Sequence, residues 1–369
     1  MKYKVPFVNY PKHYKSMKRE IDAAIKRVLT TGNLILRQDV ENFEKTLAKF
    51  LKVKYALGLN SCTDGLILSL KAAGIGPGDE VITVAHTFVA SIAAIVHAGA
   101  TPVLADVNDD YLMNPDLLEK AITSKTKAII PVHLNGRACQ MYKICQIAKK
   151  HKLLIIEDAA QGLGASFRGE KAGSFGLTGC FSFYPAKLLG AFGDAGAAVT
   201  NSKKIFDQLK LYRDHGRKTK DEIVCYGFTS RLDNLQAAIL NVKFKYLRQW
   251  INCRRKLAHI YNYGLKNIPE ITIPPESNID HFDTYQNYVI RAKKRDELQE
   301  YLKQKGIETI ISNPIAVNKQ KKLGLSSFKL PKTEQFAKEV ISLPLIPELS
   351  KKQIEYTIKT IKQFYLIKS

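Results

Sequence analysis

The sequence predicts an α/β protein: a large domain with a mostly parallel central sheet, followed by a smaller C-terminal α+β domain. Short apolar runs alternate with helical stretches, and this alternation is typical of a parallel sheet with helices on both faces. The length of 369 residues predicts two domains, because domains usually run to roughly 100 to 200 residues.

Two amphipathic helices open the chain. Residues 16–30 place Ile21, Ile25, Val28 and Leu29 on one helical face. A second stretch repeats this spacing, with apolar side chains at Val40, Phe43, Leu47, Phe50 and Leu51. Both helices are therefore expected to pack one face against the core.

Short apolar runs predict six buried strands. Residues 81–105 contain no Asp, Glu, Lys or Arg, which raises the question of a membrane span. His86, His97, Gly99 and Pro102 interrupt this segment, so a buried strand, helix and strand explain it better. The predicted strands are Tyr55 to Leu59, Val81 to Val84, Pro102 to Leu104, Ala128 to Val132, Leu153 to Ile156 and Gly179 to Phe183.

The C-terminal third has a looser spacing of elements. A long helical segment is predicted around residues 239–250, and it leads into polar, lysine-rich sequence. We therefore divide the chain into a large domain at 1–248 and a smaller domain at 249–369. In the smaller domain we expect one strand at 288–290 and helices at 297–303 and 353–364.

The composition indicates an ordinary soluble protein with a strongly basic surface. The chain has 57 Lys plus Arg against 34 Asp plus Glu, mostly as lysine spread along the sequence. A solvated surface explains this surplus better than nucleic-acid binding, because there is no basic arm and no stripe of interleaved aromatic residues. Six scattered cysteines form no C-x-x-C pair, so no metal site is predicted and a reducing cytoplasm is expected. The first ten residues lack the apolar stretch of a signal peptide.

Two stretches carry candidate catalytic groups. The strand at 153–156 continues through Glu157 into Asp158, and ligands of parallel sheets gather at the carboxyl ends of strands. A lone Asp at such a position is also a common helix cap. Lys187 lies among apolar and small residues, which predicts a partly desolvated amine, although most lysines are simply solvated. Desolvation lowers the pKa of an amine, and the neutral amine can attack a carbonyl.

A third stretch, residues 59–65, predicts an anion site. A strand there turns into a helix at Ser61, Cys62 and Thr63, and free backbone N–H groups at a helix N-terminus bind phosphate. Plain helix capping is the alternative for the hydroxyl residues. An amine, a carboxylate and an anion site in this order are together the requirements of pyridoxal-phosphate chemistry.

These motifs resemble the DegT-type family of nucleotide-sugar aminotransferases over most of the chain. The matching stretches are N-S-C-T-D-G (60–65), G-P-G-D-E-V-I-T-V-A-H-T-F (76–88), I-E-D-A-A-Q (156–161), F-S-F-Y-P-A-K (181–187), S-R-L-D-N-L-Q-A-A-I-L (230–240) and S-L-P-L-I-P-E-L-S (342–350). The resemblance implies a pyridoxal-phosphate-dependent transferase of fold type I, using the cofactor in its PLP and PMP forms. It also implies a homodimer in which both subunits build each active site.

The resemblance assigns roles by position. Lys187 would carry the cofactor as a Schiff base and, once released, shuttle a proton, while Asp158 would keep the pyridine nitrogen protonated. Phe88 would stack on the ring, and Gln161 would meet the ring hydroxyl. The phosphate would be held by the backbone at Cys62 and Thr63, by the Ser182 hydroxyl and by Thr229 from across the dimer interface. Substrate contacts are expected at Tyr184, Arg231, Gln286 and Asn313.

The substrate class implied by the family is a nucleotide-linked keto sugar, with L-glutamate as the amino donor. The stretch K-x-L-G-x-x-G-D at 187–194 is more similar to aminotransferases that act on 3-keto sugars than to those that act on 4-keto sugars. The chain departs from the family pattern at Cys62 (commonly Gly), Thr229 (Asn), residues 135–137 (Tyr-Gly-Gln), residues 312–314 (His-Tyr-Pro) and Gln286 (His). These departures bear on sugar and nucleotide specificity.

Other functions compete with this interpretation. The acceptor could instead be a 4-keto sugar or an amino-cyclitol precursor. Dehydration of a deoxysugar is disfavoured, since relatives with that activity have His where Lys187 stands. A DNA-binding regulator with an aminotransferase-like fold is the alternative of another class, although no helix-turn-helix pattern stands out.

Overall fold

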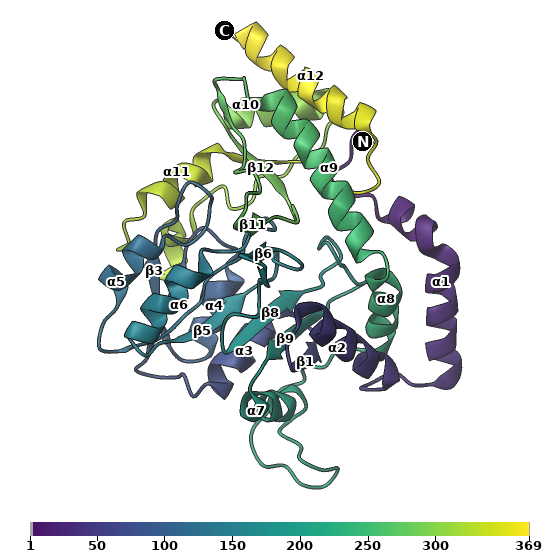
Figure 1. The fold of residues 1–369 in the computed structure, drawn as a ribbon, viewed down its shortest axis with the longest axis vertical. Coiled ribbons are helices and arrows are strands. Elements are labelled where there is room, and N and C mark those ends of the chain that lie inside the picture. Colours follow the sequence, from purple (N-terminus) through teal and green to yellow (C-terminus); the bar gives the residue numbers. More distant parts are fainter. Residues whose placement is uncertain (1–2, 369) are drawn as a thin grey trace.

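The computed structural model describes residues 3–368, in which the central sheet has seven strands in the order β1-β9-β8-β5-β4-β2-β3 (Figure 1). β2, β3, β4, β5 and β8 are mutually parallel, whereas β9 runs antiparallel to both of its neighbours. The predicted α/β class with a mostly parallel sheet is confirmed. The strands are β1 (Tyr55–Leu59), β2 (Glu80–Val84), β3 (Thr101–Ala105), β4 (Thr126–Ile129), β5 (Leu154–Asp158), β8 (Thr178–Ser182) and β9 (Gly196–Thr200).

Two details of the sheet differ from the sequence prediction. β9 was not predicted, because its Gly-Ala-Ala-Val-Thr sequence offers little of the branched and aromatic character of a strand. All five of its residues are nevertheless buried between β1 and β8, where small side chains leave room for the flanking helices. β4 ends at Ile129, three residues before the predicted end at Val132.

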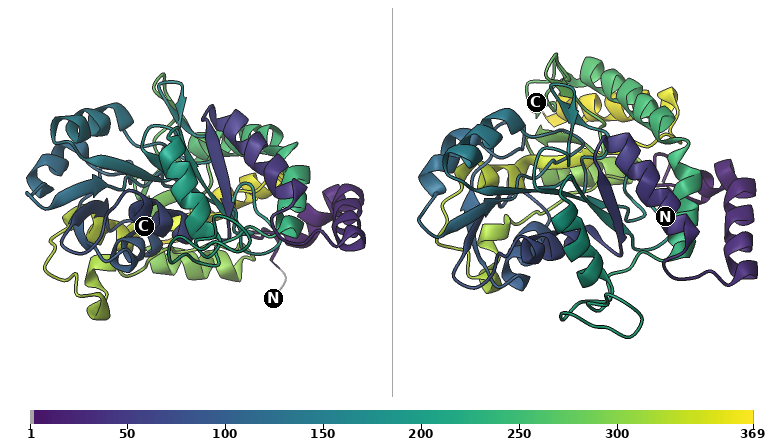
Figure 2. Two further views of the ribbon diagram at one scale, coloured as in Figure 1. Left: turned by 90° about the horizontal axis from the view of Figure 1, so that it is seen from below. Right: turned by 60° about the horizontal axis from the view of Figure 1, so that its bottom comes forward.

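Helices cover both faces of the sheet. They are α1 (Tyr10–Thr31), α2 (Gln38–Leu51), α3 (Cys62–Ala72), α4 (Ala90–His97), α5 (Leu118–Ala121), α6 (Met141–Lys150), α7 (Lys203–Arg213) and α8 (Asn234–Phe244). The two predicted N-terminal helices are confirmed as α1 and α2. Figure 2 shows α1 at one margin of the molecule, and the loop between α7 and α8 projecting from its body.

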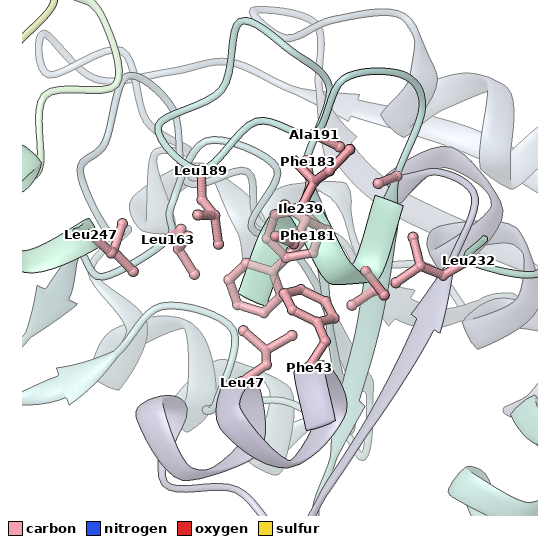
Figure 3. Close-up of a cluster of buried hydrophobic side chains, with 14 of the residues drawn as sticks. Phe43, Leu47, Leu163, Phe181, Phe183, Leu189, Ala191, Leu232, Ile239 and Leu247 are labelled. Carbon is pink, nitrogen blue, oxygen red and sulfur yellow. The ribbon is translucent and has the colours of Figure 1, made fainter. Parts of the chain in front are cut away.

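The alternation of side chains along β8 explains how the two faces are filled. Phe181 and Phe183 belong to the cluster formed by α1, α2 and α8, whereas Cys180 packs with α3 on the opposite face. Phe43 of α2 meets Phe183 edge to face, with ring centroids 5.1 Å apart (Figure 3). The strand that ends at the site is therefore held by packing on both sides.

The C-terminal part is built on a small antiparallel sheet of order β10-β12-β13, which agrees with the predicted α+β architecture. The remaining elements are β6 (Ser166–Phe167), β7 (Glu170–Lys171), β11 (His281–Phe282), β10 (Ile271–Thr272), β12 (Tyr288–Ala292), β13 (Val340–Leu343), α9 (Leu247–Leu265), α10 (Arg295–Gln304), α11 (Pro331–Glu339) and α12 (Lys351–Lys368). The predicted strand at 288–290 and the helices at 297–303 and 353–364 lie within β12, α10 and α12.

The prediction of a single helical segment at 239–250 is wrong, because the helix is interrupted at Lys245 and Tyr246, between α8 and α9. The proposed domain boundary at 248/249 falls in the first turn of α9. Trp250 and Ile251 of this helix pack in the core of the large sheet, whereas Leu257 and other residues further along pack in the C-terminal core. α9 therefore contributes to both cores.

The uncharged segment at 81–105 forms β2, α4 and β3, as predicted from its interruptions. Between residues 3 and 368 no helix combines the length and the hydrophobicity that a bilayer crossing requires.

Candidate active site

A cavity of about 530 Å³ opens at the carboxyl ends of β5 and β8, next to the N-terminus of α3. This is the edge of a parallel sheet at which ligands are expected. Most of the sequence-predicted site residues line it together, although they come from segments far apart in the chain. They are Cys62, Thr63, Phe88, Asp158, Gln161, Ser182, Tyr184 and Lys187.

Asp158 is the last residue of β5, and its carboxylate is held at both oxygens. Ser91 donates its hydroxyl to Oδ2 at 2.6 Å, and the backbone N–H of Ala160 donates to Oδ1 at 3.1 Å. The Cys62 thiol lies 3.8 Å from Oδ1. Only 5% of Asp158 is exposed, so the carboxylate has a fixed orientation in a dry part of the cavity.

Lys187 follows β8 in a short turn, with its backbone N–H bonded to the carbonyl of Tyr184 at 2.8 Å. Burial lowers the pKa of its amine, while the nearby Cys62 and Asp158 partly oppose this shift. The shift increases the neutral fraction of the amine near neutral pH. The neutral form is the one that can attack a carbonyl carbon.

The N-terminus of α3 forms the anion-binding end of the cavity. Ser61 caps this helix by accepting the N–H of Asp64 at 3.1 Å, which leaves the N–H groups of the first turn pointing outward. The close approach of this helix N-terminus to β9 requires a glycine at Gly196, because a Cβ there would lie 2.2 Å from the carbonyl carbon of Ser61. The turn at 61–63 can therefore sit directly against the sheet.

A smaller cavity of about 160 Å³ adjoins the first and shares Thr87, Phe88, Gln161 and Lys187 with it. Asn313 lines this smaller cavity and donates its amide to the Thr87 carbonyl at 2.6 Å. Asn313 thus lines the same small cavity as Lys187, and its role as a substrate contact stays a prediction.

Three predicted residues line neither of these two cavities in the part of the chain that the structure describes. Thr229 bonds to His215 at 2.9 Å, and Arg231 pairs with Asp214 at 2.5 Å, both at the base of the loop between α7 and α8. Gln286 is buried, with its side-chain amide bonded to the backbone on either side of Lys187. These three positions are where the expected site and the single chain differ.

Sequence reasoning missed two supports of the cavity. Ser91 was not predicted, because nothing in the sequence of α4 indicates that it meets β5. A buried pair joins Glu157 to His133, with 2.8 Å between Oε2 and Nε2. Since the N–H of Cys139 donates to His133 Nδ1 at 3.0 Å, the His133 proton lies on Nε2 and points to Glu157. The Glu-Asp sequence at the end of an apolar strand was the available signal for this pair.

The arrangement fits pyridoxal phosphate. Donors at the α3 N-terminus suit its phosphate, the Asp158 carboxylate suits a protonated pyridine nitrogen, and the Lys187 amine suits its aldehyde. Residues 15–362 match the DegT/DnrJ/EryC1/StrS aminotransferase family.

Several curated relatives match over nearly the whole chain. A Geobacillus stearothermophilus protein named pleiotropic regulatory protein is 40% identical over 366 residues, covering 98% of each chain. The dTDP-3-amino-3,6-dideoxy-alpha-D-galactopyranose transaminase of Aneurinibacillus thermoaerophilus is 40% identical, covering 98% of this chain and 99% of the relative. The UDP-2-acetamido-2-deoxy-3-oxo-D-glucuronate aminotransferase of Pseudomonas aeruginosa is 38% identical, with 95% and 98% covered.

Solved structures agree with the fold. DesV of S. venezuelae superposes with a TM-score of 0.94 at 38% identity, covering 99% of both chains. The NtdA protein of Bacillus subtilis, whose structure contains the bound cofactor PMP, gives a TM-score of 0.91 at 32% identity, with 100% of this chain and 86% of that chain covered.

Proposed function

The chain belongs to the DegT/DnrJ/EryC1/StrS aminotransferase family, and on that premise we propose that it moves an amino group from L-glutamate to a nucleotide-linked 3-keto sugar. The observation that carries the proposal is the meeting of Lys187, Asp158 and the N-terminus of α3 around one cavity. We assign pyridoxal phosphate as the cofactor of this cavity, which in its PMP form carries the amino group between the two substrates. Bound there, the cofactor would supply an electron sink for the reacting carbon.

The chain's own residues bind, orient and move protons. The α3 N-terminus, with the Ser182 hydroxyl, binds the phosphate, and Phe88 covers one face of the ring. Asp158 holds a proton on the ring nitrogen, in the orientation that Ser91 fixes. Lys187, whose pKa is lowered by burial, is the group that takes a proton from the substrate carbon and returns it.

The choice of the 3-keto position rests on two observations. The K-x-L-G-x-x-G-D stretch follows the pattern of 3-aminotransferases, and the names of the Aneurinibacillus and Pseudomonas relatives specify amination at C3. Those relatives use dTDP and UDP sugars respectively, so the proposal stops at a nucleoside-diphosphate sugar. Tyr184, which lines the larger cavity, and Asn313, which lines the smaller one, are the proposed sugar contacts.

We further propose that two copies of the chain complete each site. Thr229 and Arg231 lie outside the cavity of their own chain, at the base of a projecting loop that can reach a partner (Figure 2). Mixing inactive Lys187→Ala chains with inactive Arg231→Ala chains should then restore part of the activity. A mixture that stays as inactive as the two separate variants would contradict active sites shared between subunits.

A transfer assay with labelled donor tests the function. The purified protein is incubated with pyridoxal phosphate, ¹⁵N-labelled L-glutamate and a panel of 3-keto and 4-keto sugar nucleotides, and products are identified by mass. We expect ¹⁵N in the product of a 3-keto substrate and none with Lys187→Ala. Label only in a 4-keto product would overturn the C3 assignment.

The regulator alternative is tested in parallel, because the net charge of +23 and the name of the Geobacillus relative favour examining it. A DNA shift assay over a range of salt concentrations measures binding driven by phosphate contacts, which weakens steeply with ionic strength. Salt-sensitive DNA binding without transfer of ¹⁵N to any acceptor would replace the enzymatic proposal.

A further inference from the structure

The turn that enters β12 has an unusual backbone. Tyr285 adopts a left-handed conformation with φ of 51° although it is bulky and nearly buried, and such a conformation is costly for a residue with a Cβ. Strained residues persist where the surroundings over-determine them, and they cluster at functional sites. The contacts that stabilise this turn, and the residues that the turn itself positions, therefore indicate its role.

Arg254 of α9 and Gly136 hold the turn in place. One Arg254 nitrogen, Nη1, donates to the carbonyls of Tyr285 and Gln286 at 3.1 Å each, and to that of Leu345 at 2.6 Å. Gly136 packs so closely against the turn that a Cβ there would lie 2.5 Å from the backbone nitrogen of Gln286. Hydrogen bonds to its carbonyls and close packing against the Gly136 backbone therefore both restrict the turn.

The turn in its turn positions the segment that carries Lys187, through the side chain of Gln286. The side-chain oxygen of Gln286 accepts the backbone N–H of Leu188 at 2.6 Å, and its side-chain nitrogen donates to the carbonyl of Ala186 at 3.1 Å. Both ends of one buried amide are therefore bonded to the two residues that flank Lys187. Gln286 is 7% exposed, so water cannot readily replace these bonds.

The next residue of the turn reaches the other side of the cavity. Asn287 donates its amide to Gln161 Oε1 at 3.2 Å, and the same oxygen accepts the N–H of Asn135 at 2.9 Å. One short segment from the C-terminal part therefore orients both the Lys187 turn and a predicted cofactor contact.

We propose that Gln286 is a positioning residue for Lys187 rather than a substrate contact. This inference rests on the proposed function, in which the Lys187 amine reacts and moves protons. The Gln286 amide bonds the main chain on both sides of Lys187. The Lys187 backbone is therefore held in place, and the amine extends into the cavity from a fixed position. We call these two hydrogen bonds of the Gln286 amide the clamp. Without the clamp the turn at 186–188 can shift, and a misplacement of about 1 Å costs a catalytic group roughly 100-fold in rate.

The matched variants are Gln286→Leu, Gln286→Glu and Asn318→Leu. Gln286→Leu is of similar size and removes both hydrogen bonds, whereas Gln286→Glu retains an acceptor for the Leu188 N–H. Asn318→Leu is the control, because this amide is also buried but bonds to Phe328 and Glu334, and Asn318 lines neither cavity. Thermal unfolding of all three variants reports any general loss of stability.

Two measurements test the clamp. The first follows acylation of Lys187 in the cofactor-free protein against pH, by quantitative peptide mass spectrometry. We expect its midpoint to rise in Gln286→Leu, as the loosened amine gains water, and to stay at the parent value in Asn318→Leu. An unchanged midpoint in Gln286→Leu overturns the proposal, whether or not the parent shows sugar aminotransfer.

The second measurement separates kcat from KM on the substrate that the transfer assay identifies. We expect kcat to fall about 100-fold in Gln286→Leu, less in Gln286→Glu, with KM unchanged in both. A raised KM for the sugar nucleotide with kcat unchanged would show that Gln286 is a substrate contact and would overturn the proposal. Absence of transfer by the parent would instead count against the proposed function, while the acylation midpoint still decides the clamp.

Discussion

The proposed cofactor side and the proposed substrate side of the active site are built in different ways. On the cofactor side, Asp158 ends a strand of the large sheet, and Lys187 and the α3 N-terminus each follow a strand within a few residues. On the substrate side, Asn313 comes from a distant C-terminal loop, and Arg231 lies outside the cavity of its own chain. Under the proposed function, the comparison teaches that cofactor chemistry depends on local strand-end geometry, whereas substrate selection depends on segments that can change without disturbing that geometry.

The largest effect is expected at Lys187. Lys187→Ala should lower turnover by about 10⁴-fold, because it removes both the nucleophilic amine and the proton carrier. The fold should persist, since the thermal unfolding transition depends on packing that this side chain does not provide. Substantial remaining turnover in a preparation free of wild-type protein would count heavily against the cofactor-side assignment.

Asp158→Asn should have the next largest effect, on the order of 100-fold in turnover. The neutral amide cannot stabilise a protonated ring nitrogen as a carboxylate does, although it fills the same space. Steady-state kinetics with saturating cofactor measure the change. A rate equal to the parent's would show that Asp158 has no such role.

Ser91→Ala should lower turnover by about tenfold, because a hydrogen bond to a charged group is worth roughly 1.5–3 kcal/mol. The variant leaves Asp158 in place and removes only the hydroxyl that holds its Oδ2. Ser69→Ala is the matched control, since Ser69 is buried on α3 and bonds to Cys180 instead. Equal losses in the two variants would point to a general packing defect.

The smallest effect concerns Lys243 and the pH dependence of the free energy of unfolding. Lys243 donates to the Gly190 carbonyl, and burial lowers its pKa to about 8. Between that value and the ordinary lysine pKa the unfolded chain binds more protons, so the free energy of unfolding rises with pH, by at most about 1.4 kcal/mol per pH unit for this group. Lys243→Met should reduce that slope in the cofactor-free protein, whereas Lys256→Met, at an exposed position of α9, should not. Equal slopes would show that Lys243 is not titrating there.

The sequence was sufficient to predict where several residues of the proposed cofactor side lie. Strand alternation predicted that Asp158 ends a buried strand, and the apolar surroundings of Lys187 predicted a desolvated amine whose pKa is lowered. The predicted aminotransferase class is confirmed by the family match. These features could be predicted because each motif is contiguous and its strand direction determines where it emerges.

The remaining features depend on tertiary contacts that no local pattern encodes. β9 was missed because its residues are small, and the break between α8 and α9 because both flanks are helical. Ser91 and Gln286 act through hydrogen bonds to residues 67 and about 100 positions away. Sequence reasoning placed Gln286 on the substrate, whereas its amide is bonded to the Lys187 turn.

The central claim is that Lys187 is the residue that holds the cofactor. The most direct test is borohydride reduction of the protein loaded with pyridoxal phosphate, followed by peptide mapping. The account predicts one modified peptide, with the cofactor attached at Lys187. Attachment at another lysine, or no attachment at all, would contradict it.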